Sequence, residues 1–268
     1  MGTGHRNTRT RRTVLHQPRL TLRMEHAITA AALLNVWEQG RTQSQVQRAL
    51  SLLALAAGSN PPGEVSQFSI GRRDAELLRL RETLFGHHMA ANAGCPGCQQ
   101  TVELNFKTAD IRAEPGGERR EVGLIQLGDY EIEFRLPNSE DLAALPAGSE
   151  VETQKRFLVL RCITRAAQQG EPFPTSQINS EMIEALSSRM AELDPQGDVQ
   201  LTLTCPHCGH HWRTPLDIVS FLWSEIHSCA QRLLREVHAI AIAYSWREGD
   251  ILAMSPLRRQ SYLELIGQ

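Results

Sequence analysis

Two short segments carry the side chains best suited to chemistry, and both have the form Cys-Pro-x-Cys. The first covers residues 95–98 and the second residues 205–208. In such a turn both thiolates can point at one ion while backbone N–H groups hydrogen-bond to the sulfurs. Four thiolates from two turns form a closed tetrahedral site, which is the structural type of zinc site. The sequence therefore predicts a structural Zn²⁺ ion bound by Cys95, Cys98, Cys205 and Cys208.

The two cysteine pairs are far apart in the sequence. Residues 99–204 separate them, whereas about 15–20 residues separate the pairs of a compact zinc ribbon. Closing a loop of this length costs roughly 4–5 kcal/mol, and a structural zinc site contributes on the order of 10–16 kcal/mol. Metal binding therefore outweighs loop closure, and the pattern predicts a split zinc ribbon with a subdomain between its halves.

Thiol redox chemistry is the main alternative, because Cys205-Pro-His-Cys208 matches the active-site tetrapeptide of strong thiol oxidases. In thioredoxin-like folds that motif opens a helix, whose N-terminus lowers the pKa of the first thiol. Here Gly-His-His-Trp-Arg-Thr-Pro follows, which is a poor helix start and a plausible strand. Nearby histidines could also replace a cysteine as a ligand or hydrogen-bond to a ligating cysteine. They are His87, His88, His207, His210 and His211.

Composition indicates one or two soluble globular domains. The chain has 268 residues, of which 41% are hydrophobic and 22% charged. It contains no run of about 18 apolar residues and no apolar core of a signal peptide. We therefore expect a cytoplasmic protein without a membrane span, whose six cysteines are thiols or metal ligands. Cys162 and Cys229 fall in helical patterns and are expected to be core residues.

The first 23 residues differ in charge from the rest. They hold six arginines and no acid, so a disordered basic arm is expected, with Met24 as a candidate native start. Removing six from 28 basic residues leaves 22 against 30 acidic residues, a net charge of −8 for the body. An acidic body argues against a nucleic-acid-binding surface.

Hydrophobic periodicity predicts an α+β protein, with helical regions at both ends and a β-rich, zinc-ribbon-like centre. The expected regions are 24–90 (helical), 91–214 (split zinc ribbon with a helical insertion at about 138–194) and 215–268 (long helix and helical tail). Asp74 is expected to cap a helix in the first region, and residues 150–168 to be helical. Gly128-Asp129 predicts a hairpin turn.

The C-terminal third has the most regular pattern. Apolar residues at steps of three and four predict one helix from about Asp217 to Trp246, followed by a turn at Gly249 and a last helix from Pro256. A second stripe through Trp223, Ala230, Leu234 and Ala241 could face another protein. The residues expected to bind a partner are Trp223, Leu234, Trp246 and Tyr262.

No catalytic motif accompanies these elements. The sequence has no Gly-x-Ser-x-Gly elbow, Walker loop, Gly-x-Gly-x-x-Gly, His-Glu-x-x-His or calcium loop. The pattern therefore favours a protein that is not an enzyme and takes no small-molecule substrate.

The C-terminal signature resembles the baseplate protein family of T-even-type phages. It consists of Tyr244-Ser-Trp246, Ile251-Leu252-x-Met254-Ser-Pro256 and Arg258-Arg259-x-x-Tyr262-Leu263-Glu-Leu265. Upstream, Leu33-Leu34-x-Val36-Trp37-Glu38-x-Gly40, Ile70-Gly-Arg-Arg-Asp74, Leu84-Phe85-Gly86 and both cysteine pairs resemble its zinc-bearing bacterial branch. The likeness covers roughly residues 24–268. Gln99 departs from the Cys-Pro-x-Cys-Gly form that Gly209 keeps, so a looser first turn is expected.

The resemblance implies a function without catalysis. The family includes the baseplate hub assembly chaperone, and relatives are found with contractile tails and phage-tail-like injection systems. It offers no active-site residues. We therefore expect an assembly chaperone that binds baseplate or hub proteins, or alternatively a structural subunit incorporated into the particle. A thiol-disulfide oxidoreductase and a nucleic-acid-binding zinc-ribbon protein remain the alternatives from other classes.

Overall fold

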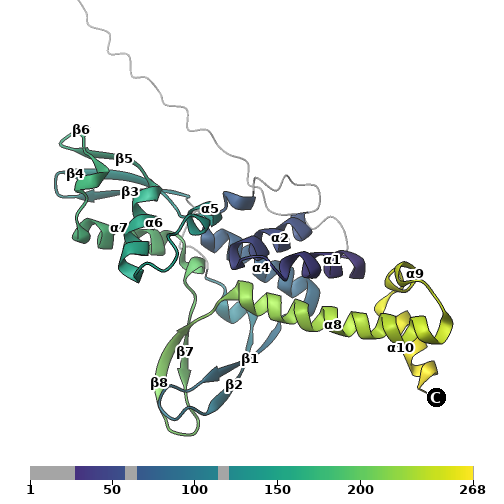
Figure 1. Cartoon of the computed structure of the whole chain (residues 1–268). Helices are drawn as coiled ribbons and strands as arrows, with labels where there is room; N and C mark the ends of the chain where they lie inside the picture. Colours follow the sequence, from purple (N-terminus) through teal and green to yellow (C-terminus); the bar gives the residue numbers. More distant parts are fainter. Residues whose placement is uncertain (1–27, 58–64, 114–120, 268) are drawn as a thin grey trace, which may run out of the picture.

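The computed structural model describes residues 28–57, 65–113 and 121–267. The predicted basic arm at residues 1–23 and the candidate start at Met24 lie outside these ranges. Helices occupy both ends of the described chain and β-sheets its middle, which confirms the predicted α+β class (Figure 1). No helix within the described ranges combines the length and the apolarity needed to cross a membrane.

The main hydrophobic core joins the N-terminal helices to the first half of the long helix α8 (Ile218–Tyr244). It is built from α1 (Ala30–Gly40), α2 (Gln45–Ala57), α4 (Ile70–Phe85) and this half of α8. Leu52, Leu77, Leu222 and Ile226 are fully buried there. These side chains recur at helical spacing, so each helix presents one apolar face to the others. Figure 1 shows α8 running along the N-terminal helices and continuing past them.

The start of α4 differs from the prediction. Ser69, not Asp74, is the N-cap, and its hydroxyl accepts a hydrogen bond from the Arg72 N–H at 3.2 Å. Asp74 lies within the helix and pairs with Arg73. The helix therefore begins one turn earlier, because a serine hydroxyl satisfies its first free N–H group as well as a carboxylate would.

A middle lobe holds a four-stranded antiparallel sheet in the order β3 (Val122–Leu127), β4 (Tyr130–Arg135), β5 (Ile163–Gln168) and β6 (Glu171–Pro172). The helices of this lobe are α5 (Ser139–Ala143), α6 (Val151–Cys162) and α7 (Ser180–Leu193). Side chains of α6 and α7 share a hydrophobic cluster with Ile132 and Phe134 of β4. The lobe is thus a two-layer unit with its own core.

Two predictions for this lobe are corrected. The helix expected over residues 150–168 ends at Cys162, and Ile163–Gln168 is strand β5, paired with β4. The segment at 138–194 is therefore not a purely helical insertion, because it supplies two strands to the sheet. The hairpin turn at Gly128-Asp129 is confirmed between β3 and β4, with Gly128 at φ 58°.

The C-terminal tail folds back on the far half of α8. It contains α9 (Glu248–Leu252) and α10 (Pro256–Ile266), which share a small cluster with Val237 and Ile240 of α8. The expected turn at Gly249 is wrong, since Gly249 lies inside α9. The chain turns instead at Ser245, whose φ of 59° is left-handed, so α8 ends with a common C-terminal geometry.

Asp141 connects three elements of the middle lobe. Its carboxylate accepts bidentate hydrogen bonds from Arg135 of β4 at 2.5 and 2.8 Å, and a further bond from Arg161 of α6 at 3.1 Å. The Asn138 N–H also donates to it at 3.0 Å. Burial alone would raise the pKa of Asp141, but the Arg135 guanidinium and the Asn138 N–H lower it below its usual value.

We predict that Asp141→Asn destabilises the protein by about 2 kcal/mol, because it removes charge-assisted hydrogen bonds from a buried group. The Asp141 contribution is fully present above the pKa of an unfolded aspartate, about 3.9. It is lost as pH falls through the lower folded value. Urea unfolding at neutral pH should therefore separate the variant from the native protein, and the difference should shrink in acid. Exposed Glu103→Gln is the control, and equal stability of all three proteins would contradict the prediction.

Candidate metal centre

The two Cys-Pro-x-Cys segments form the tips of two β-ribbons. The first tip connects β1 (His88–Gly94) with β2 (Thr101–Lys107), and the second connects β7 (Gln200–Thr204) with β8 (His211–Pro215). In Figure 1 both ribbons extend together from the helical core. Val102, Leu104 and Trp212 pack with the cysteines in one small cluster. The ribbons therefore meet at their tips.

The four predicted thiols converge. Their sulfur atoms all lie within 4.8 Å of one another. The Cys95 and Cys208 sulfurs are 3.7 Å apart, and those of Cys98 and Cys205 are 3.6 Å apart. A tetrahedral ion with metal–sulfur bonds of about 2.3 Å needs sulfur–sulfur separations of about 3.8 Å. The arrangement thus fits a four-thiolate metal site. No other group of three or more His, Cys, Asp or Glu ligand atoms gathers this closely within the described ranges.

The two turns share one backbone geometry. The Cys95 N–H donates to the Gln100 carbonyl and the Cys205 N–H to the His210 carbonyl, both at 2.9 Å. In return Gln99 donates to the Cys95 carbonyl at 2.8 Å, and Gly209 to the Cys205 carbonyl at 2.9 Å. Gln99 has a φ of 62° and Gly209 a φ of 73°. The expectation of a looser first turn is therefore wrong, because Gln99 adopts the left-handed conformation that glycine adopts in the second turn.

Because the four thiols lie close together, the pKa values of Cys205 and Cys208 differ from each other. Burial opposes ionisation of Cys205, but the N–H groups of Cys208 and His207, together with neighbouring thiols, lower its pKa to about 6. At Cys208 the His210 N–H favours the thiolate, yet burial and the three nearby sulfurs raise the pKa to about 12. One thiol therefore ionises easily, and its negative charge opposes ionisation of the neighbouring thiols. A divalent cation at the centre would remove this repulsion.

The nearby histidines have other contacts. His210 stacks on Trp212 at 6.1 Å and lies against Gly97, where an added Cβ would come within 3.1 Å of its ring. His211 Nδ1 lies 2.8 Å from the Thr204 hydroxyl, and His87 lies 3.4 Å from a Glu82 oxygen. None of these imidazoles belongs to the four-sulfur group. The expectation that a histidine replaces a cysteine is therefore not supported at His87, His210 or His211.

The remaining two cysteines lie in the cores. Cys162 is fully buried at the end of α6, where burial and nearby Asp141 raise its pKa to about 12. Cys229 is partly buried on α8 beside the main core. The expectation of a core residue is confirmed for Cys162, whereas Cys229 lies at the margin of the main core.

The residues predicted to bind a partner lie in different environments. Trp223 is partly buried against the end of α1, where a Cβ added to Gly40 would lie 2.2 Å from its ring. Trp246 and Tyr262 pack against each other at 4.9 Å in the C-terminal cluster. Leu234 is 37% exposed, whereas Ala230 is fully buried. The continuous second stripe expected along α8 is therefore interrupted at Ala230, and partner binding by the four residues stays a prediction.

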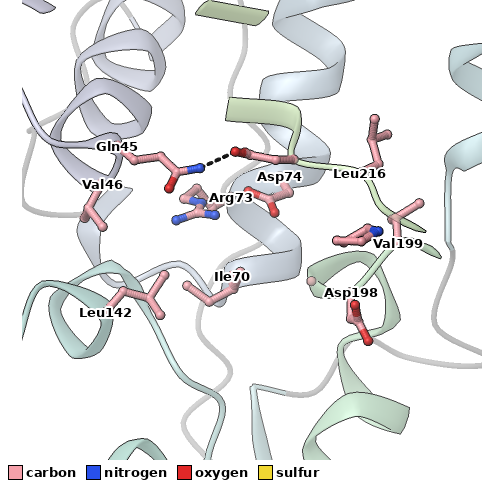
Figure 2. A pocket seen from close by; sticks show the side chains of 12 residues that line it. Gln45, Val46, Ile70, Arg73, Asp74, Leu142, Asp198, Val199 and Leu216 are labelled. Carbon is pink, nitrogen blue, oxygen red and sulfur yellow. Dashed lines mark hydrogen bonds and ion pairs between the residues drawn. The ribbon is translucent and has the colours of Figure 1, made fainter. Parts of the chain in front are cut away.

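A pocket of about 260 Å³ lies where the main core, the middle lobe and the root of the second ribbon meet (Figure 2). Arg73 pairs with Asp74 at 2.7 Å inside it, and Gln45 donates to Asp217 at 2.5 Å. Burial raises the pKa of Asp74 although Arg73 opposes the shift. The lining contains no serine, threonine, cysteine, histidine or lysine. These two pairs engage polar groups of the lining with one another, as at a packing junction.

Comparison with protein families identifies the setting of this fold. The model of the T4 bacteriophage base plate protein family matches residues 20–223. The chain belongs to this family. The matched segment contains both cysteine pairs, the middle lobe and the first turns of α8, and it ends before the C-terminal signature at 244–265. No curated protein and no solved structure matches the chain. The family therefore connects the protein to phage baseplates.

We predict that the purified protein carries about one tightly bound metal ion per chain, because four thiolates are placed around one point. Cys205→Ser should lose the ion, since three thiolates and a hydroxyl bind a soft cation more weakly. Cys229→Ser is the matched control and should retain it. Elemental analysis by mass spectrometry of the three proteins measures the ratio. Equal metal content in native protein and Cys205→Ser would contradict the assignment.

Proposed function

We propose that this protein is a non-enzymatic assembly factor for the baseplate hub of a phage-like contractile tail or injection system. It would act in the cytoplasm by binding baseplate or hub proteins. Family membership supports the setting. The absence of a catalytic motif from the sequence supports a role in binding, and the lining of the junction pocket holds no serine, threonine, cysteine, histidine or lysine.

The observation that carries the proposal is the C-terminal arm, which we define as residues 234–266. Figure 1 shows this arm projecting beyond the N-terminal helices. It contains most of the large apolar side chains that are exposed in the described ranges: Leu234, Ile242, Leu257, Leu265 and Ile266. Ile242 is 70% exposed and Leu257 79%. Exposed apolar groups concentrated on one projection are typical of a protein-binding surface.

The arm is also held in a fixed shape. Arg259 of α10 is 3% exposed, and its guanidinium binds Glu236 of α8 at 2.9 Å and the Met254 carbonyl at 2.7 Å. Tyr244, Trp246 and Tyr262 pack with ring centroids 4.8–5.5 Å apart. A rigid surface loses little conformational entropy when it binds. Such an arm suits a factor that presents one geometry to an assembling partner.

We further propose that the metal is zinc and that its role is structural. Cys95, Cys98, Cys205 and Cys208 would hold it, and the donor set of four thiolates favours zinc among common divalent ions. Zinc bound this way holds two ribbons together and has no open position for a substrate. The cysteine pair at 205–208 lies at a ribbon tip followed by strand β8, not at the start of a helix. This position supports a structural site over a redox site.

We predict that protein loaded with zinc has no thiol–disulfide oxidoreductase activity, because all four thiols at the centre are metal ligands. Insulin reduction in the presence of dithiothreitol should proceed at the background rate. Metal analysis should give zinc and not iron. Turnover that disappears in Cys205→Ala would show that the thiols exchange disulfides, and the structural assignment would be wrong.

We predict that deleting the gene leaves sheath and tube proteins expressed while complete contractile particles are lost. Electron microscopy of particle preparations measures the effect. Complementation with the double variant Ile242→Asp/Leu257→Asp should fail, because two charges would interrupt the apolar surface of the arm. Val151→Asp is the matched control, since Val151 is 77% exposed on the middle lobe. Normal particles from the deletion strain would rule out an assembly role.

Mass spectrometry of purified native particles then separates the two roles open to a family member. An assembly factor is absent from the finished particle. A structural baseplate subunit is present in fixed proportion to the other baseplate proteins. Presence of the protein in fixed proportion would therefore show that it is a structural subunit and not an assembly factor.

A further inference from the structure

The sheet of the middle lobe has one protected edge and one unprotected edge. The β6 edge is only two residues long and ends in Pro172. The β3 edge is six residues long, Val-Gly-Leu-Ile-Gln-Leu, with no charge, proline or bulge. Short strands, prolines and charges are the usual devices that prevent edge-to-edge pairing. They are present on β6 and missing on β3.

The backbone of β3 presents hydrogen-bonding groups away from the sheet. The Leu136 N–H donates to the Glu121 carbonyl at 2.8 Å, which makes residues 121 and 136 a hydrogen-bonded pair. Because such pairs alternate along an antiparallel ladder, Gly123, Ile125 and Leu127 bond to β4. The N–H and C=O groups of Val122, Leu124 and Gln126 therefore point outward. No backbone hydrogen bond from another described segment reaches them.

The side chains of this edge are apolar and accessible. Val122 is 65% exposed and Leu124 is 54% exposed on the face of the sheet that points away from the lobe core. Ile125 and Leu127 are half-buried at the margin of that core. The charges of the exposed face lie farther in, where Arg165 of β5 pairs with Glu131 and Glu133 of β4 at 3.0 Å. An incoming strand would thus meet apolar side chains and free backbone groups.

We propose that β3 is a self-association edge, and that its occupant is β3 of a second copy of this chain. In antiparallel pairing the outward-pointing residues must face each other. Leu124 then lies opposite Leu124 of the partner subunit, and Val122 opposite Gln126 of the partner subunit. In this register no two charged residues face each other across the interface. A two-fold rotation about an axis normal to the sheet maps the pairing onto itself. It joins two four-stranded sheets into one, whose remaining edges are the two short β6 strands with Pro172.

The second copy fits this edge better than a segment of a different protein. The edge is uncharged and offers nothing that would select a charged partner. Two-fold pairing also removes both unprotected edges at once, which a peptide bound to each copy would do only with two partners. A six-residue edge buries less than the 1,200–2,000 Å² of a standard interface. The dimer should therefore be reversible and depend on protein concentration. This proposal is independent of the proposed function.

Sedimentation velocity of the full chain over a concentration series tests the association. The mass should rise from monomer toward dimer as concentration increases. Leu124→Lys should remain monomeric, because two lysines would face each other at the axis. Val151→Lys, which alters an exposed apolar residue on α6 (77% exposed, against 54% for Leu124), should associate like the native protein. Circular dichroism and metal content should match in all three. A native protein that stays monomeric at its solubility limit would overturn the proposal, even if it binds other proteins through β3.

Cysteine cross-linking tests the register. Paired residues in a hydrogen-bonded antiparallel position have Cα atoms about 5.5 Å apart, which a disulfide can bridge. Leu124→Cys should therefore give a covalent dimer under mild oxidation. Val122→Cys, which faces Gln126 of the partner subunit, should not, whereas combining it with Gln126→Cys should. Equal cross-linking of Leu124→Cys and Val122→Cys would show random encounter and contradict the ordered pairing.

Discussion

The convergence of the four thiols is the constraint that closes the chain around its middle lobe. Cys95 follows the strand that leaves the N-terminal helices, and Cys208 precedes the strand that leads into α8. Bringing their sulfurs to 3.7 Å closes a loop that contains the whole middle lobe. The entropy of that closure is modest compared with the free energy of binding a metal at four thiolates. The lobe can therefore fold on its own core while the two ends of the chain meet around α8.

Features encoded by local pattern could be predicted from the sequence. The cysteine pairs could be assigned to one site because both have the pattern Cys-Pro-x-Cys and because four thiolates match a known zinc coordination. The long helix was predictable because Leu222, Ile226, Leu233 and Val237 repeat at helical spacing. The hairpin at Gly128-Asp129 follows from a turn that requires a positive φ between two alternating segments. For the helix and the hairpin, the signal lies within a few residues of the element that it predicts.

Features set by distant contacts could not be predicted this way. Strand β5 continues directly from α6, and only pairing with β4 thirty residues earlier makes it a strand. Five of the seven residues of strand β1 are alanine, asparagine or glycine, which have little strand preference, so its partner β2 determines it. Gln99 adopts a left-handed conformation within the turn that its N–H closes on the Cys95 carbonyl. Ala230 is buried because the N-terminal helices cover it, which the pattern of α8 alone does not reveal.

The position of the ribbons separates the four-cysteine centre from the C-terminal arm (Figure 1). The roots of both ribbons pack on the main core through Phe106, Val199 and Leu201, and only their tips rely on the thiols. The first turns of α8 are fixed by the same core, with Leu222 and Ile226 fully buried. The direction of the arm is therefore determined by helix packing, and the proposed metal would determine how the two tips stay joined. Removing the ion should loosen the tips while α8 keeps its direction, so a metal-free variant would test what the ribbons themselves contribute to assembly.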